Sequence, residues 1–333
     1  MFELTETKIK KWSAEIGIAD LGLSELDIRL TNALKVIYSD NFLSNHLYLK
    51  GGTAINKLYL QKTARLSVDL DFNSIGKKEE VIAERNNVRD KIAQLLKELD
   101  EEYMIKKKDT YEQTTIKVGY TPFFGPNKQY MKIEISNIER FSVLDKVLKE
   151  IKVSDSSDIT KINTYSIEEL IATKLRALYD RLKGRDIYDL YFLSSLDFDK
   201  ILVRKLVLYY FYRSKKIFNP KLFFKNIKDK FMLKTYIDDV STFIRADIPF
   251  SIDKGAERLL SSYSFLREFD DEDNDFIILA RHLLGKPVKK IYVKKISEIG
   301  YPLRHLFKND SRLSAEALNV RVEDIRLKIK KET

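Results

Sequence analysis

The chain has 333 residues, of which 44% are hydrophobic and 33% are charged, and it contains no cysteine. This composition is sufficient for a packed core and excludes disulfide scaffolds, zinc–thiolate sites and cysteine nucleophiles. The formal net charge of +10 favours polyanionic partners such as nucleic acids or nucleotides, although the ion-pair-rich surface of a thermophile fits the same composition.

No segment of the sequence is typical of a membrane span or a signal peptide. The longest apolar run, residues 206–212, is much shorter than the ~20 residues that a membrane helix needs. The N-terminal residues also lack the apolar core of a signal peptide. We therefore expect a cytoplasmic protein with no membrane partner.

In chain order, the apolar pattern predicts helices up to residue 45 and then strands alternating with helices. The expected strands are 46–52, 66–74, 103–109, 113–121 and 129–136, and the expected helices are 53–61 and 77–101. After a short polar stretch at 153–158, almost everything has helical periodicity. We predict an α+β protein with a mixed sheet flanked by helices in residues 1–150 and a mostly α-helical domain in residues 151–333.

Two carboxylates stand out on the strand predicted at 66–74. Because side chains alternate along a strand, Asp69 and Asp71 share one face, and Leu70 and Phe72 share the other. Two adjacent ionised carboxylates beside a core are unfavourable unless a cation offsets them, and Mg²⁺ prefers such hard oxygen ligands. An ordinary strand with a solvated acidic face is the alternative.

The segment Gly51-Gly52-Thr53 lies where a predicted strand meets a predicted helix. Helix N-termini present free backbone N–H groups to anions, glycines allow a phosphate to approach closely, and Thr53 adds a hydroxyl. The alternative is a tight turn with a threonine cap. The spacing matches neither a Walker loop nor a dinucleotide fingerprint.

A glycine turn followed by an acid-x-acid strand is typical of the head of the nucleotidyltransferase fold. That superfamily adds a third carboxylate from a neighbouring strand. Glu134, on the strand predicted at 129–136, is the best match in this sequence. A solvent-facing strand residue is the alternative for Glu134.

Two charged residues follow in the helical part of the chain. Ser166 and Glu169 have the spacing of a capping box, and Lys174 lies on or beside the apolar stripe of the helix that they begin. A lysine at such a position either extends to solvent or meets an anion. Asp186 opens the next helix, where an acid in the first turn is the default structural interpretation.

Together, Gly51-Gly52-Thr53, Arg65-x-Ser67-x-Asp69-x-Asp71, Lys174 and Arg185-Asp186 resemble the AbiEii/AbiGii toxin family over roughly residues 46–195. These are nucleotidyltransferase-like proteins of abortive-infection toxin–antitoxin systems, related to the MenT toxins. The resemblance implies a toxin that uses a nucleoside triphosphate, and some members transfer nucleotides to the acceptor end of tRNA. A cognate antitoxin is a further implied partner.

The resemblance also implies roles for the residues that carry it. Asp69 and Asp71, with weaker support for Glu134, are expected to hold Mg²⁺ or Mn²⁺. The turn at Gly51, Gly52 and Thr53, together with Ser67 and Lys174, is expected to bind the triphosphate. Asp186 is expected either to accept the proton of the attacking hydroxyl or to orient Lys174.

Two other functions stay open at this point: a transferase of the same fold acting on a small molecule or a protein hydroxyl, and a non-catalytic nucleotide-binding protein. For an RNA acceptor, residues 204–234 and 286–295 are candidate contacts, because aromatic and basic residues alternate there. The alternative for 204–234 is a pair of amphipathic helices with aromatic residues in the core.

Overall fold

The computed structural model describes residues 4–61, 65–152, 159–232 and 240–326, so the polar stretch at 153–158 lies outside the described residues. Contacts divide the chain into two compact units, each made of three segments. Unit 1 contains residues 1–141, 146–165 and 240–249, and unit 2 contains residues 142–145, 166–239 and 250–333. The sequence interpretation has instead one boundary near residue 150.

Unit 1 is built on a seven-stranded mixed sheet with the strand order β3-β4-β5-β2-β1-β7-β6. Its strands are β1 (Leu47–Lys50), β2 (Asp69–Ser74), β3 (Met104–Asp109), β4 (Gln113–Tyr120), β5 (Gln129–Ser136), β6 (Val147–Lys152) and β7 (Ile159–Thr164). The first five lie within the expected ranges, although β2 begins at the first of its two aspartates. The predicted mixed sheet flanked by helices is confirmed.

The strands β6 and β7 contradict the expectation of helical structure after about residue 150. They form an antiparallel pair, and β7 joins the sheet by running parallel to β1, with Thr164 beside Leu49. Alternation in short runs that mix apolar, polar and charged residues is a weak signal, and tertiary pairing decides their conformation.

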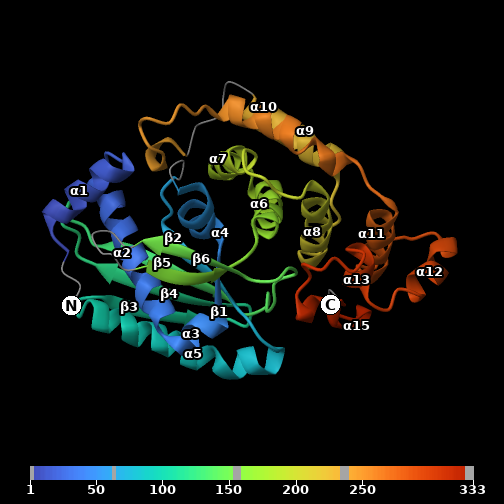
Figure 1. Ribbon diagram of the computed structural model, residues 1–333, viewed down its shortest axis with the longest axis horizontal. Helices are drawn as coiled ribbons and strands as arrows, with labels where there is room; N and C mark the ends of the chain where they lie inside the picture. The colour runs from blue at the N-terminus through green and yellow to red at the C-terminus, as the bar shows by residue number, and fades with distance from the viewer. Residues whose placement is uncertain (1–3, 62–64, 153–158, 233–239, 327–333) are drawn as a thin grey trace, which may run out of the picture. The chain divides into compact units, whose positions relative to one another are not determined.

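Three helices cover the apolar face of the sheet, and a fourth packs against them (Figure 1). They are α1 (Glu6–Ile16), α2 (Leu21–Ser39), α3 (Asn41–His46) and α5 (Lys78–Leu99), with α1 packed on α2. Leu70 and Phe72 of β2 are fully buried on this face, and the Tyr38 ring of α2 lies 6.2 Å from that of Phe72. At β2 to β5, the opposite face of the sheet carries the polar side chains.

A helical segment follows β1 at once, as α4 (Gly51–Ala54) and the π-helix η1 (Ile55–Leu60). The helix therefore begins two residues earlier than the predicted 53–61, and Gly51 and Gly52 form its first turn. A short 3₁₀ helix, η3 (Ser241–Phe243), also belongs to unit 1, where the Phe243 carbonyl accepts a hydrogen bond from the Leu66 N–H.

Unit 2 is helical apart from its loops. Its helices are α6 (Ile167–Arg181), α7 (Gly184–Leu193), α8 (Lys200–Arg213), α9 (Pro220–Phe231), α10 (Ile252–Ser262), η4 (Ser264–Arg267), α11 (Asp271–Leu283), α12 (Lys290–Ser297), α13 (Pro302–Leu306), α14 (Ala315–Leu318) and α15 (Val322–Ile325). Residues 209–212 on α8 and Phe223 and Phe224 on α9 are buried. These aromatic residues therefore form the core of unit 2, and they are not available to stack on RNA bases.

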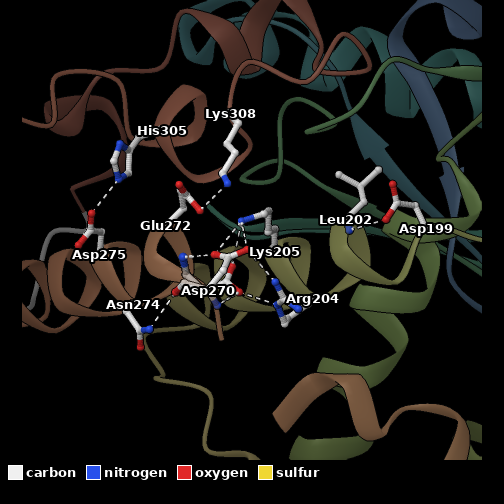
Figure 2. Close-up of polar contacts among 11 residues, drawn as sticks. Asp199, Leu202, Arg204, Lys205, Asp270, Glu272, Asn274, Asp275, His305 and Lys308 are labelled. Atoms are coloured by element: carbon white, nitrogen blue, oxygen red, sulfur yellow. Dashed lines mark hydrogen bonds and ion pairs between the residues drawn. The ribbon is translucent and has the colours of Figure 1, made fainter. Parts of the chain in front are cut away.

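Glu169 and a second buried cluster show how polar groups are satisfied inside unit 2. Glu169 is fully buried and accepts hydrogen bonds from the N–H groups of Val143 and Leu144 and from the Tyr210 hydroxyl. At the start of α11, Arg204 and Lys205 of α8 pair with Asp270 and Asp273 (Figure 2).

In the part of the chain that the structure describes, no helix combines the length and the apolar character needed to cross a bilayer.

Candidate active site

Three carboxylates gather on the polar face of the unit 1 sheet, as the sequence predicts. Asp69 and Asp71 lie two positions apart on β2, and the parallel register with β5 places Glu134 directly beside Asp71. One carboxylate oxygen from each residue lies within 4.8 Å of the other two, and all three side chains are partly exposed. The cluster is accessible from solvent, and two paired strands carry it.

This donor set fits a hard divalent cation. Three carboxylates so close together repel one another, and a bound cation removes that repulsion. Mg²⁺ prefers oxygen ligands from one or two carboxylates, with water and phosphate oxygens completing its coordination. Mn²⁺ accepts the same donors. Lys132 contacts Glu134 at 2.7 Å, and the Gln113 amide also donates to it, so Glu134 is held by its neighbours.

The glycine turn lies against this cluster. Gly51 has a positive φ of 70°, and a Cβ atom at this position would lie 2.3 Å from an Asp71 carboxylate oxygen. At Gly52, a Cβ atom would lie 3.0 Å from both the Arg65 guanidinium and the Ser67 hydroxyl. Only glycine lets the backbone approach these side chains so closely.

Two buried side chains connect the turn to β2 and to the residues just before it. The Thr53 hydroxyl is fully buried and donates to the Asp69 carbonyl oxygen. The Asn56 amide donates to the Gly52 carbonyl at 2.8 Å, and its oxygen accepts from the Arg65 N–H at 2.9 Å. The sequence analysis did not identify Asn56 as part of the site. The only feature of the sequence that could have identified it is a polar residue on the buried side of a short helix.

The Ser67 hydroxyl oxygen is buried and has no hydrogen-bond partner within the described ranges. A buried hydroxyl without a partner is unfavourable by about 1–3 kcal/mol. Because Ser67 faces the Gly52 backbone, an anion bound at the turn would supply the missing acceptor. This observation is independent of the carboxylate cluster and is compatible with an anion at the turn.

Ser67 and Arg65 also line a cavity of about 680 Å³ in unit 1. Across this cavity, Lys57 contacts Asp27 at 2.6 Å, and the Trp12 indole donates to the same carboxylate. The volume is in the range of small-molecule sites.

Lys174 and Asp186 lie in unit 2, in a buried charge network. The Lys174 ammonium contacts Asp186 at 3.3 Å and Asp189 at 2.9 Å, and Arg181 makes two hydrogen bonds to Asp186. Both aspartates are fully buried and the Lys174 side chain is 6% exposed. Lys174 therefore meets anions, one of the two outcomes expected for it, and both are carboxylates of the protein itself.

The electrostatic balance at Asp186 follows from this geometry. Burial by itself raises the pKa of Asp186, but Lys174 and Arg181 outweigh it and hold the pKa below its usual value. Asp186 is in the first turn of α7, as predicted, while Asp189 was missed as a partner of Lys174. The spacing of Asp186 and Asp189, three residues apart on one helix face, is the signal that could have identified the pair.

A mixed sheet with a glycine turn, an acid-x-acid strand and a third acid on the neighbouring strand defines a nucleotidyltransferase. A family model described as the nucleotidyl transferase AbiEii toxin of a type IV toxin–antitoxin system matches residues 32–267. The chain therefore belongs to the AbiEii nucleotidyltransferase toxin family, and the resemblance predicted from its motifs is confirmed.

One solved structure supports this fold. The MenT4 nucleotidyltransferase toxin from Mycobacterium tuberculosis is similar over 92% of this chain and 99% of its own, with a TM-score of 0.64 and 17% identity. The JHP933 protein from Helicobacter pylori matches with a TM-score of 0.44 and 20% identity, over 80% of this chain and 94% of its own. Among curated proteins, no sequence matches this chain.

Proposed function

We propose that this protein transfers a nucleotide from a nucleoside triphosphate to a hydroxyl of an RNA acceptor, with tRNA the favoured candidate. In this proposal, the protein acts in the cytoplasm as the toxin of a toxin–antitoxin pair involved in abortive infection, and a cognate antitoxin restrains it. The observation that carries the proposal is the cluster of Asp69, Asp71 and Glu134 beside the Gly51–Gly52 turn, inside the segment that matches the family.

We assign Asp69, Asp71 and Glu134 as ligands of Mg²⁺ or Mn²⁺. When bound, the cation neutralises negative charge on the triphosphate and on the oxygens that attack and leave. The chain's own contribution is to hold three carboxylates in register on two adjacent strands, so that they are ordered before the ligand binds.

We assign the backbone N–H groups of the turn at Gly51, Gly52 and Thr53 to the phosphate oxygens, with the Ser67 hydroxyl as an additional donor. In the reaction, an acceptor hydroxyl oxygen forms a bond to the α-phosphorus. The bond between the α-phosphorus and the oxygen that bridges it to the β-phosphorus breaks, and pyrophosphate leaves with the electron pair of that bond. The hydroxyl proton passes to a base or to water. For Lys174 we retain neutralisation of the phosphate charge, and for Asp186 either acceptance of the hydroxyl proton or orientation of Lys174.

The test uses purified protein, Mg²⁺, total RNA and each α-labelled nucleoside triphosphate in turn. Asp69→Asn and Asp71→Asn should each lower labelling of RNA by about 100-fold or more. Each substitution removes a carboxylate ligand of the cation, and the positive charge of the cation stabilises the transition state. Glu98→Gln, at an exposed position on α5, is the matched control and should retain full activity.

Full labelling by either aspartate variant would contradict the metal site. Label on a small molecule or a protein in place of RNA would favour the other transferase function. Triphosphate binding by the wild type without turnover on any acceptor would favour a non-catalytic protein.

A further inference from the structure

We propose that the polar face of β3, β4 and β5 binds a single-stranded end of the RNA acceptor and leads it to the carboxylate cluster. We call this surface the lysine face, and its residues are Met104, Lys106, Lys108, Lys117, Lys128, Tyr130 and Lys132. The inference rests on the proposed function and adds to it the surface that holds the acceptor.

The strand register aligns the lysines with the catalytic cluster. Asp69 of β2 stands beside Lys132 of β5, Lys132 is opposite Lys117 of β4, and Lys117 is opposite Lys106 of β3. Directly paired residues point to the same side of a sheet, so these four side chains form one row. At about 4.8 Å between strands, the row runs ~14 Å from the aspartate to the outermost lysine.

The next row has the same polarity. Asp71 stands beside Glu134, Glu134 is opposite Thr115, and Thr115 is opposite Lys108. In both rows the carboxylates lie at the β2 end and a lysine lies at the β3 edge. The acidic cluster and the basic surface are therefore two ends of one continuous face.

Lys132 is compensated by its contact with Glu134 at 2.7 Å, but the lysines farther from the cluster are not compensated within the described residues. Like charges directly opposite on neighbouring strands are destabilising, by up to about 1 kcal/mol per pair. Lys106 and Lys117 are exposed and form no ion pair in the described ranges, and the same holds for Lys108. By contrast, Lys107 points to the other face of the same strand and contacts Asp90 of α5 at 2.8 Å. The uncompensated lysines favour an external polyanion.

An aromatic ring lies among these lysines. Tyr130 is 44% exposed, and its ring lies over Gly119 of β4, where a Cβ atom would come within 3.0 Å of it. The Lys117 ammonium lies 3.8 Å from the ring centroid. The absence of a side chain at position 119 lets the ring lie across the sheet, as a base-stacking platform needs.

The aromatic ring favours a single strand over a duplex or an acidic protein. Stacking on Tyr130 requires a base that is not already paired and stacked, which only a single-stranded segment offers. An acidic protein would pair with the lysines but has no need of an exposed ring among them. A single-stranded end with a free hydroxyl also supplies the acceptor hydroxyl that the proposed reaction at the carboxylate cluster needs.

The test measures binding without turnover, by fluorescence anisotropy of a labelled single-stranded RNA of about 12 nucleotides in the absence of triphosphate. Affinity of the wild type should fall steeply with salt. In the double variant Lys106→Gln/Lys117→Gln, the slope of log K against log salt should become shallower by about 1.4, since each lost phosphate contact removes ~0.7. Lys107→Gln, on the opposite face of the same strand, is the matched control and should bind as the wild type does.

A second pair of variants tests stacking separately from charge. Tyr130→Ala should weaken binding by about tenfold, while Tyr130→Phe, which retains the ring, should bind as the wild type does. Duplex RNA of the same length should bind more weakly and respond little to Tyr130→Ala. The proposal that the lysine face binds RNA would be overturned if Lys107→Gln weakened RNA binding equally. It would also be overturned if neither the lysine variants nor the Tyr130 variants had an effect.

The failures of the two proposals are distinguishable. If the wild type labels RNA and the lysine double variant labels it with an unchanged KM for RNA, the lysine face is wrong and the proposed function stands. If RNA binds through these lysines but no triphosphate labels it, the lysine face stands and the proposed transfer to RNA is wrong.

Discussion

Lys174 illustrates at the scale of a residue how the structure refines a chemical expectation. The side chain is buried between Asp186 and Asp189, and Arg181 contacts Asp186 from the side that is exposed to solvent. In this network, Lys174 and Arg181 bring positive charge to two buried carboxylates. Such a network is weak evidence for stability as a whole, but it becomes very unfavourable when one member is removed.

Lys174→Met should therefore lower the free energy of unfolding by about 3–5 kcal/mol, because it removes the ammonium group that contacts both buried carboxylates. Urea unfolding followed by circular dichroism measures this change. Arg181→Gln, at a side chain that is 52% exposed, is the control and should have a smaller effect. If Lys174→Met unfolds as the wild type does, the predicted contribution of Lys174 to stability is wrong, and a loss of RNA labelling in that variant would then support its role on the phosphates.

At the scale of an element, the start of α11 shows why the acidic run at residues 270–275 is not a metal loop. Asp270 caps the helix by accepting the Asp273 N–H, and the Asp273 carboxylate in turn accepts the Asp270 N–H. Arg204 and Lys205 then supply the positive charge (Figure 2). The run forms the start of the helix itself, and Asp270 and Asp273 already have their partners.

This cap predicts a specific dependence of stability on pH. Partial burial raises the pKa of Asp270, but the Asp273 N–H and Lys205 outweigh it and hold the pKa at about 2, below the usual 3.8. Because the pKa is lower in the folded state, the carboxylate stabilises the fold above about pH 4, and this stabilisation is lost as the pH falls towards 2.

Asp270→Asn keeps a capping side chain but removes the charge. It should lower the urea midpoint at pH 7, and the difference from the wild type should shrink steadily as the pH falls from 4 to 2. A difference that is constant across this range would show that the charge of Asp270 has no part in the stability of α11.

At the scale of the whole molecule, ligand binding and folding are linked through unit 1. The cation and triphosphate are expected to bind groups that only the folded sheet brings together. At a ligand concentration of about 100 times Kd, binding to the folded state alone adds ~2.7 kcal/mol to its stability.

We expect a nucleoside triphosphate with Mg²⁺ to raise the melting temperature by several degrees, and a chelator to abolish the effect. Asp71→Asn should abolish the part that depends on Mg²⁺, because it removes a ligand beside the glycine turn. Differential scanning fluorimetry measures both. An equal shift in the variant, or one that persists with the chelator, would contradict a cation held by these carboxylates.

Much of the fold was predictable because it depends on local patterns. The alternation at residues 66–74 places Asp69 and Asp71 opposite Leu70 and Phe72, and the structure retains this arrangement. The strands β6 and β7 were not predictable, since their short runs, with lysines among the apolar residues, acquire strand structure only by pairing with the rest of the sheet.

The sequence by itself determined the family, the order of the motifs and the face of β2 that carries the carboxylates, since these depend on residue type and on a period of two. The tertiary structure decided which residues meet. Glu134 reaches the aspartates only through the parallel register of β2 and β5, and Lys106 and Lys117 join their row only through the pairing of β3, β4 and β5. Spacing along the chain carries no information about register between distant strands, because register is set by the packing of the whole sheet.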